Sequence, residues 1–300
     1  MSASRKFLVL ILTLALLPLS LTAAEPETGK TAGDTSYERQ IQLIGRQTAL
    51  AHRLVRSMCF AQAGIDVKRN RALVADTRRE VAAAFVALKE GDPARGIAPI
   101  TNGNILTQLG SAEMVWNGLD KKAASFLSEG MQDDEVLKLT FKSQSLEKLW
   151  RNVSQSLELK TSVELSPEYL MRSRLVITAG DQNRLLQQAG KDACLIYLDQ
   201  GAETNVARRE DLSADLSTFN QNIFNLTFTR PAQSDQPDAP ALEQATFSTW
   251  QTWVGLEPLF YALITPSNQA NLSALLPELS FSIEYMDLQL VETLEIFMAL

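Results

Sequence analysis

Apolar residues recur at three- and four-residue steps along most of the chain, which is the spacing of amphipathic helices. The runs alternating between apolar and polar residues that are typical of strands are few. The spacing predicts helices over roughly 41–58, 73–88, 105–126 and 135–157, then 167–199, 206–228, 241–263 and 270–298. We therefore expect an all-α fold of two tandem four-helix bundles.

The two sets of helices carry matching residues. Gly45, Gln47, Leu50, Cys59 and Asn70 recur 135 positions later as Gly180, Gln182, Leu185, Cys194 and Asn205. The segment Trp116-Asn-Gly118-Leu119 recurs as Trp253-Val-Gly255-Leu256, 137 positions later. A shared offset that drifts by two residues indicates an internal duplication with a small loop insertion. The predicted domains are residues 37–165 and a degenerate second copy, residues 166–300.

The first 24 residues have a different pattern. Arg5 and Lys6 precede an almost wholly apolar run over 7–21, and small residues follow at Ala23 and Ala24. This order is typical of a cleaved secretory signal peptide, with an uncleaved membrane anchor as the alternative. Residues 25–36 are predicted to be a flexible linker, and no later apolar run is long enough to cross a bilayer. We expect a soluble periplasmic protein.

Charge narrows the range of partners. The formal net charge is −7, and removing the predicted signal peptide with Arg5 and Lys6 lowers it to −9. An acidic surface argues against nucleic acid and against anionic membranes as partners. A small anion remains a candidate ligand, but only where cations gather locally.

The chain has two cysteines, Cys59 and Cys194, at the same place in the two copies. Two interpretations stay open. If the copies pack about a pseudo-two-fold axis through their first helices, the cysteines meet and form a disulfide, which constrains the unfolded chain by about 4–5 kcal/mol in the loop-entropy account. If they do not meet, each is a buried free thiol.

Groups suited to catalysis are scarce. His52 is the one histidine, and we expect its side chain to be solvated or interfacial. No metal-spaced cluster, Gly-rich phosphate loop or Ser-His-Asp order is visible, so we predict no metal, no cofactor and no enzyme activity. Trp116 and Trp253 are interpreted as core residues whose neighbouring glycines allow close helix approach, with ligand stacking as the alternative.

The first predicted helix holds the sharpest candidate binding site, formed by Arg46, Gln47, Arg53 and Arg56. Guanidinium groups pair well with planar oxyanions such as carboxylate or nitrate. The alternative is a solvated basic face that pairs with acids elsewhere. The second copy has Asp181, Gln188 and Lys191 at the positions of the three arginines. We therefore place an anion site in the first copy.

A known family shares this pattern. The run Ile44-Gly45-Arg46-Gln47 with Leu50 and Arg53, then Asn70-Arg71 and Trp116, resembles the N-terminal sensor domain of type IV pilus methyl-accepting chemotaxis transducers (PilJ-type). That domain is related to the periplasmic domain of nitrate/nitrite sensor kinases (NarX-like). The resemblance covers about residues 38–125 and, more faintly, 172–262.

The resemblance implies an all-helical, non-enzymatic periplasmic sensing module that often works as a dimer. The family's anion-contacting arginine falls on Thr48 here and on Asn183 in the second copy, while Arg53 matches the family's second arginine. The second copy would then stand in for a dimer partner, as a pseudo-dimer, or the chain would form a homodimer.

Two functions follow from these features. The first is a sensory or ligand-binding module for a small anion, linked to chemotaxis or two-component signalling. The second is a periplasmic adaptor or structural interaction protein that docks on a membrane receptor or sensor kinase and has no small ligand. The loss of arginine at Thr48 favours the adaptor. The apolar helix over 288–300 could supply its contact patch, although the amphipathic pattern favours an ordinary bundle helix.

Overall fold

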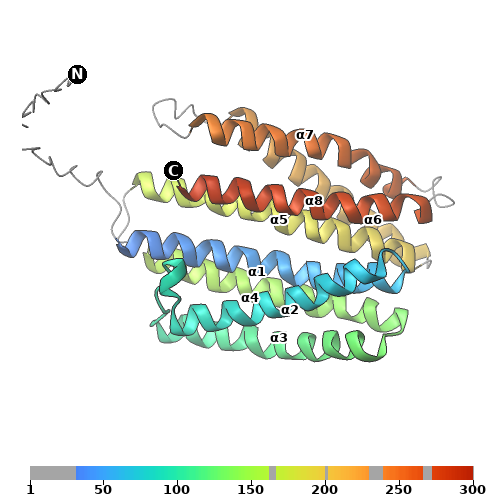
Figure 1. Ribbon diagram of the computed structural model, residues 1–300, viewed down its shortest axis with the longest axis horizontal. Helices are drawn as coiled ribbons and strands as arrows, with labels where there is room; N and C mark the ends of the chain where they lie inside the picture. Colours follow the sequence, from blue (N-terminus) through green and yellow to red (C-terminus); the bar gives the residue numbers. More distant parts are fainter. Residues whose placement is uncertain (1–31, 162–166, 200–201, 230–238, 266–271, 300) are drawn as a thin grey trace, which may run out of the picture.

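The computed structural model describes residues 32–161, 167–199, 202–229, 239–265 and 272–299, and this part of the chain is helical, as the spacing predicts (Figure 1). The helices are α1 (Ala32–Gln62), α2 (Val67–Glu90), α3 (Gly103–Glu129), α4 (Asp133–Thr161), α5 (Pro167–Leu198), α6 (Ala202–Phe224), α7 (Ala239–Ile264) and α8 (Leu272–Ala299). A short 3-10 turn, η1 (Pro93–Arg95), follows α2, and a π-helical turn, η2 (Asn225–Thr229), extends α6.

The predicted and observed helices differ mainly at their ends. Helix α1 begins at Ala32, so the last residues of the expected linker over 25–36 are helical. The predicted signal peptide over 1–24 lies outside the described residues. Gly91 ends α2 with a positive φ of 85°, and its N–H donates to the carbonyl of Ala87. Asn102 begins α3 by accepting hydrogen bonds from the N–H groups of Asn104 and Ile105.

The helices lie side by side in two groups, with α1 to α4 on one side of the molecule and α5 to α8 on the other (Figure 1). Helices α1 and α5 meet in the middle and contact each other extensively. Helix α1 also packs on α2 and α4, and α5 packs on α6 and α8. The two halves therefore face each other through their first helices, which is the arrangement that the pseudo-dimer hypothesis requires.

The two halves share one hydrophobic core. A single cluster of buried side chains includes Leu54 and Phe60 of α1, Leu186 and Leu195 of α5, and residues of all the other helices. The boundary between residues 165 and 166 thus separates the halves along the chain without separating their packing. The predicted tandem halves therefore pack as one body, because α1 and α5 each contribute apolar side chains to the shared core.

The repeated tryptophans lie in this core, as predicted. Trp116 is 3% exposed and Trp253 is 1% exposed, and the indole N–H of Trp253 donates to Asn220 Oδ1 at 3.2 Å. The predicted role of their glycines is wrong. A Cβ added at Gly255 would meet no heavy atom within 4 Å, and one at Gly118 would reach only Lys142 Nζ at 3.8 Å. Close helix approach at these glycines is therefore absent.

The C-terminal helix packs as an ordinary bundle helix, the favoured of the two interpretations of its apolar residues. Leu290, Phe297 and Met298 are buried, so most of the apolar face over 288–300 packs inside the molecule instead of forming a contact patch. Leu288 is 67% exposed and lies on the outer face of α8 together with Phe281 and Tyr285. The amphipathic spacing of an ordinary bundle helix explains both observations.

Candidate functional site

The predicted arginines gather around carboxylates from other helices. Arg46 donates from Nη1 and Nη2 to the two carboxylate oxygens of Asp287 at 2.8 and 3.2 Å, and its Nε lies 2.9 Å from Glu80 Oε1. Arg56 pairs with Glu284. Arg53 lies between them, 3.7 Å from Glu80, 3.8 Å from Glu284 and 4.0 Å from Asp287. We call these six residues the arginine cluster.

The arginine cluster is internally balanced and largely buried. Its three guanidinium groups face three carboxylates, and the side chains of Arg56 and Asp287 are 1% and 2% exposed. Burial alone would raise the pKa of Asp287, but Arg46 and Arg53 hold that pKa well below its usual range. The alternative interpretation is therefore right that these arginines pair with acids elsewhere and wrong that their face is solvated. The three arginines do come together, but protein carboxylates occupy the place expected for a free anion.

Gln47, the fourth predicted residue, is fully buried and donates from its amide to the carbonyl of Leu43. The carbonyl that accepts from Gln47 thus lies on the same helix, away from the carboxylates of the arginine cluster. Gln182, at the matching position of α5, is also fully buried. The two glutamines behave as core residues of the helix pair, not as ligand contacts.

A second polar group crosses the interface between the halves. His52 Nε2 on α1 lies 2.9 Å from Glu147 Oε2 on α4, and the same carboxylate pairs with Arg151 and lies 3.4 Å from Arg184 of α5. Arg184 also pairs with Asp181, with its Nε 2.9 Å from Asp181 Oδ1. We call these five residues the histidine cluster. The side chain of His52 is 0% exposed, so the expected solvated position is wrong and the interfacial one is right.

The protonation of this pair follows from its surroundings. Burial and the charge of Lys191 lower the pKa of His52 to about 4, so the imidazole is neutral at pH 7. Burial would raise the pKa of Glu147, but the hydrogen bond from His52 and nearby arginines lower it to about 2. Because an ionised carboxylate can only accept, His52 Nε2 carries the proton and donates it to Glu147.

Acids in and beside the two clusters lie at matching positions of the two halves. Glu80 and Asp215 are 135 residues apart, and Glu147 and Glu284 are 137 apart, the offsets that already relate the two halves. Arg56 of α1 reaches Glu284 in the other half, while Arg184 of α5 reaches Glu147 in the first. The binding site predicted from the sequence did not include these acids. Extending the two offsets to charged residues would have found them.

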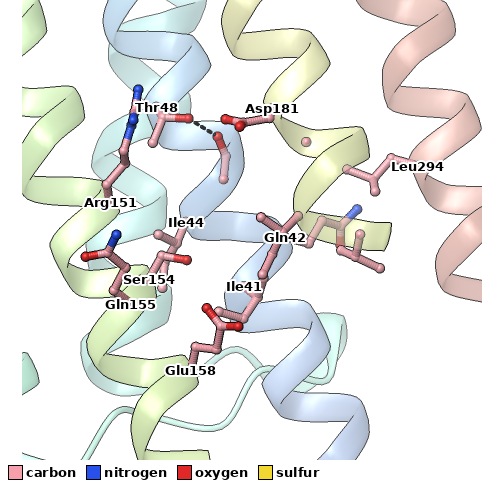
Figure 2. A pocket seen from close by; sticks show the side chains of 14 residues that line it. Ile41, Gln42, Ile44, Thr48, Arg151, Ser154, Gln155, Glu158, Asp181 and Leu294 are labelled. Carbon is pink, nitrogen blue, oxygen red and sulfur yellow. Dashed lines mark hydrogen bonds between the residues drawn. The ribbon is translucent and has the colours of Figure 1, made fainter. Parts of the chain in front are cut away.

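A pocket of about 250 Å³ opens beside the histidine cluster, between α1, α4 and α5, with Leu294 of α8 at its edge (Figure 2). The motif glycines Gly45 and Gly180 both line it, and a Cβ added at either would meet no heavy atom within 4 Å. Thr48, one helical turn after Gly45, also lines it. This space is smaller than the range typical of drug-sized ligands, so it suits a small metabolite.

The pocket mixes apolar and charged groups. Ile41, Ile44, Val176 and Leu294 supply the apolar surface, and Arg151, Asp181 and Glu158 supply one positive and two negative charges. Of the four residues predicted to bind a ligand, none lines this pocket. The pocket and the four predicted residues therefore share helix α1 but lie on different faces of it.

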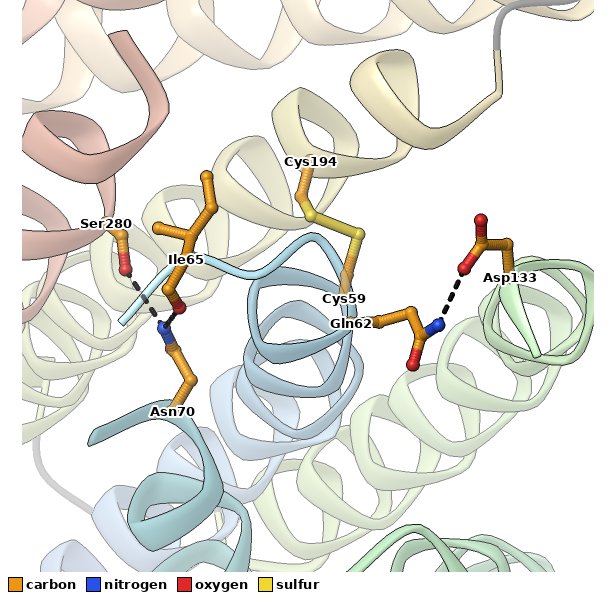
Figure 3. The surroundings of a disulfide bond; sticks show 7 residues. All are labelled: Cys59, Gln62, Ile65, Asn70, Asp133, Cys194 and Ser280. Atoms are coloured by element: carbon orange, nitrogen blue, oxygen red, sulfur yellow. Dashed lines mark hydrogen bonds between the residues drawn. A yellow bond between two sulfur atoms is a disulfide. The ribbon is translucent and has the colours of Figure 1, made fainter. Parts of the chain in front are cut away.

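The disulfide lies further along the same two helices (Figure 3). Cys59 of α1 and Cys194 of α5 are bonded, with their Cα atoms 6.1 Å apart, which confirms one of the two interpretations of the cysteine pair. Asn70 lies nearby and donates to the carbonyl of Ile65 at 2.8 Å. The covalent link joins the two halves at one place along α1, and the pocket lies between them at another.

Three observations bear on other classes of function. Within the described ranges, no group of three or more histidine, cysteine, aspartate or glutamate side chains is placed to hold a metal ion. No helix among those residues is long and apolar enough to span a bilayer. Comparison with protein-family models, with curated proteins and with solved structures found no match to this chain.

Proposed function

We propose that the protein is a non-enzymatic sensory or ligand-binding module of the periplasm, in which the two halves act as a pseudo-dimer around one small-molecule site. The pocket between α1, α4 and α5 carries this proposal, because both halves supply its lining. The resemblance of the first half to PilJ-type and NarX-like sensor domains supports it, since in the nitrate sensors the first helix carries the anion-contacting arginine at the dimer interface. The link to chemotaxis or two-component signalling rests on that resemblance.

A ligand held between two halves is suited to signalling. Contacts with Thr48 on α1 and Asp181 on α5 would depend on how the two helices lie relative to each other. A ligand that contacts both halves shifts the equilibrium toward the arrangement it binds best. The disulfide between Cys59 and Cys194 fixes one point of the interface, so a shift at the pocket end would turn the halves about that point.

The test fills the pocket without disturbing the fold. Gly45→Leu places a side chain where the backbone leaves open space, and Gly255→Leu, on α7 away from the pocket, is the matched control. Thermal unfolding is measured against nitrate, nitrite, short carboxylates and free amino acids. A ligand at 100 times its Kd stabilises the wild type and the control by about 2.7 kcal/mol, and Gly45→Leu abolishes the shift. No shift with any compound, or an equal shift in Gly45→Leu, would overturn the proposal.

The adaptor function has one observation in its favour. Phe247, Val254 and Tyr261 form an exposed stripe on α7, whereas the positions 137 residues earlier are Gly110, Asn117 and Ala124. An exposed apolar stripe that only one half carries can mark a protein contact. The adaptor proposal predicts that Phe247→Ser with Tyr261→Ser loses a partner that the wild type recovers from an envelope extract. Recovery of the same proteins by both would count against it.

A further inference from the structure

One end of the pocket carries a positive side chain, Arg151, and a negative one, Asp181. Arg151 and Asp181 are the two ends of an alternating chain of charges that runs from Arg151 through Glu147 and Arg184 to Asp181. The inner members neutralise each other and their side chains are each only 9% exposed, whereas those of Arg151 and Asp181 are 52% and 47% exposed. Both ends line the pocket. They therefore offer a guanidinium and a carboxylate to a ligand at the same end of the pocket (Figure 2).

A third charge lies at the opposite end. Glu158 is seven residues after Arg151 on α4, which is two helical turns or about 10 Å. Figure 2 shows Arg151, Thr48 and Asp181 at one end of the pocket and the Glu158 carboxylate near Ile41 at the other. Apolar side chains, including Ile44 and Val176, line the space between the two ends.

We propose that the pocket binds a free basic amino acid of the lysine class. The ligand's carboxylate pairs with Arg151, its α-ammonium with Asp181 and its side-chain ammonium with Glu158. The four methylenes of such a ligand lie along Ile41, Ile44 and Val176, where burial of apolar surface adds to the affinity. This inference rests on the proposed function and names its ligand class.

The same charges disfavour the ligands that the sequence alone suggested. Nitrate or nitrite in this pocket would meet one guanidinium and two carboxylates, and it would leave the apolar surface without a partner. An aliphatic amino acid such as leucine would leave the Glu158 carboxylate unpaired in a partly closed space. A diamine has no carboxylate to pair with the exposed part of Arg151. The pattern of three charges therefore distinguishes these classes.

Isothermal titration calorimetry with L-lysine, L-leucine, cadaverine and nitrate tests the ligand class. L-lysine is expected to bind the wild type at least tenfold more tightly than the other three compounds. Glu158→Gln and Asp181→Asn each weaken lysine binding at least tenfold, and Glu158→Gln leaves leucine binding unchanged. Asp76→Asn, an exposed aspartate on α2 far from the pocket, is the control and binds lysine normally. Unchanged thermal midpoints without ligand establish that the variants fold.

The outcomes separate this inference from the function on which it rests. If nitrate or leucine binds as well as lysine and Gly45→Leu blocks that binding, the ligand class is wrong and the binding function holds. If lysine binds equally well to wild type, Glu158→Gln and Asp181→Asn, the assigned contacts are wrong. If none of the four compounds binds, this ligand class is overturned, and the broader thermal series with short carboxylates then decides the binding function.

Discussion

The arginine cluster and the histidine cluster occupy related positions in the two halves, yet they are built from different groups. The arginine cluster pairs guanidinium groups with carboxylates, and the pKa of Asp287 lies well below its usual range. The histidine cluster contains His52, whose pKa is lowered to about 4, and it lies near Asp215, whose pKa is raised to about 7. The arginine cluster is therefore charged at every ordinary pH, whereas groups in and beside the histidine cluster change protonation with pH.

The difference shows that two clusters at matching positions of the halves can have different roles. Two identical clusters would hold the halves together equally on both sides. Here the arginine cluster is closed and self-neutralising, whereas the histidine cluster ends in the half-exposed Arg151 and Asp181 beside a pocket. A buried charge held by an opposite charge fixes geometry, and a partly exposed group remains able to bind a ligand.

Removing the disulfide should give the largest effect, because it tests whether either cluster can hold the halves without a covalent link. The double variant Cys59→Ser with Cys194→Ser is expected to lose about 5 kcal/mol of unfolding free energy, since the bond closes a loop of 135 residues. Urea unfolding measures the loss, and reduced wild type should match the variant. A change below about 1 kcal/mol would mean that the two clusters and the shared core suffice.

Breaking the arginine cluster should cost more than breaking the histidine cluster. Asp287→Ala leaves Arg46 buried without its main partner and is expected to cost about 3–5 kcal/mol. Glu147→Ala should cost less, because Arg151 is half exposed and Arg184 keeps Asp181. Denaturant unfolding of both variants measures the difference. Equal costs would contradict the distinction between a closed and an open cluster.

Asp215 and His52 should make the unfolding free energy depend on pH in opposite directions. Burial, together with the charge of Asp192, raises the folded-state pKa of Asp215 to about 7. The contribution of this group is fully present below its unfolded pKa near 4 and is lost as pH rises through 7. The folded-state pKa of His52 is instead lowered to about 4, so its contribution is present above about 6.5 and lost as pH falls to 4.

Two variants test these two pH dependences separately. Asp215→Asn should remove the decline in stability between pH 4 and 7, and His52→Gln should remove the loss between pH 6.5 and 4. Gln187 occupies the position of His52 in the second half, so the histidine variant copies the sequence of the other half. Thermal midpoints from pH 4 to 8 measure both terms. Curves parallel to that of the wild type would show that neither group titrates as described.

The smallest effects compare glycines of the two first helices. Gly45→Ala should raise the unfolding free energy by about 0.5–1 kcal/mol, because alanine favours a helix and the new Cβ meets no atom within 4 Å. Gly190→Ala should lower it, because its Cβ would lie 2.6 Å from Ile283 Cδ1 and 2.9 Å from Arg56 Cδ. Chemical denaturation resolves the two signs. A gain at Gly190 would mean that α5 and α8 can move apart without cost.

The sequence by itself predicted the helices closely. Helix formation is local, so the three- and four-residue spacing located α5 as 167–199 against an observed Pro167–Leu198, and α7 as 241–263 against Ala239–Ile264. The repeat of Cys59 as Cys194 also raised the pairing of the first helices before any coordinates, although it left free thiols equally open. These successes depend on patterns that neighbouring residues or an internal comparison can reveal.

Only the tertiary structure decided what the charged residues of α1 do. Arg46 meets an acid 241 residues away and His52 meets one 95 residues away, and helical spacing says nothing about partners so distant. A charged helix face normally meets water, so the sequence predicted either a free anion for the arginines or a solvated face pairing with acids that it could not name. The pocket likewise exists only because α1 and α5 bring Gly45 and Gly180 to the same space, where two missing side chains leave room for a ligand.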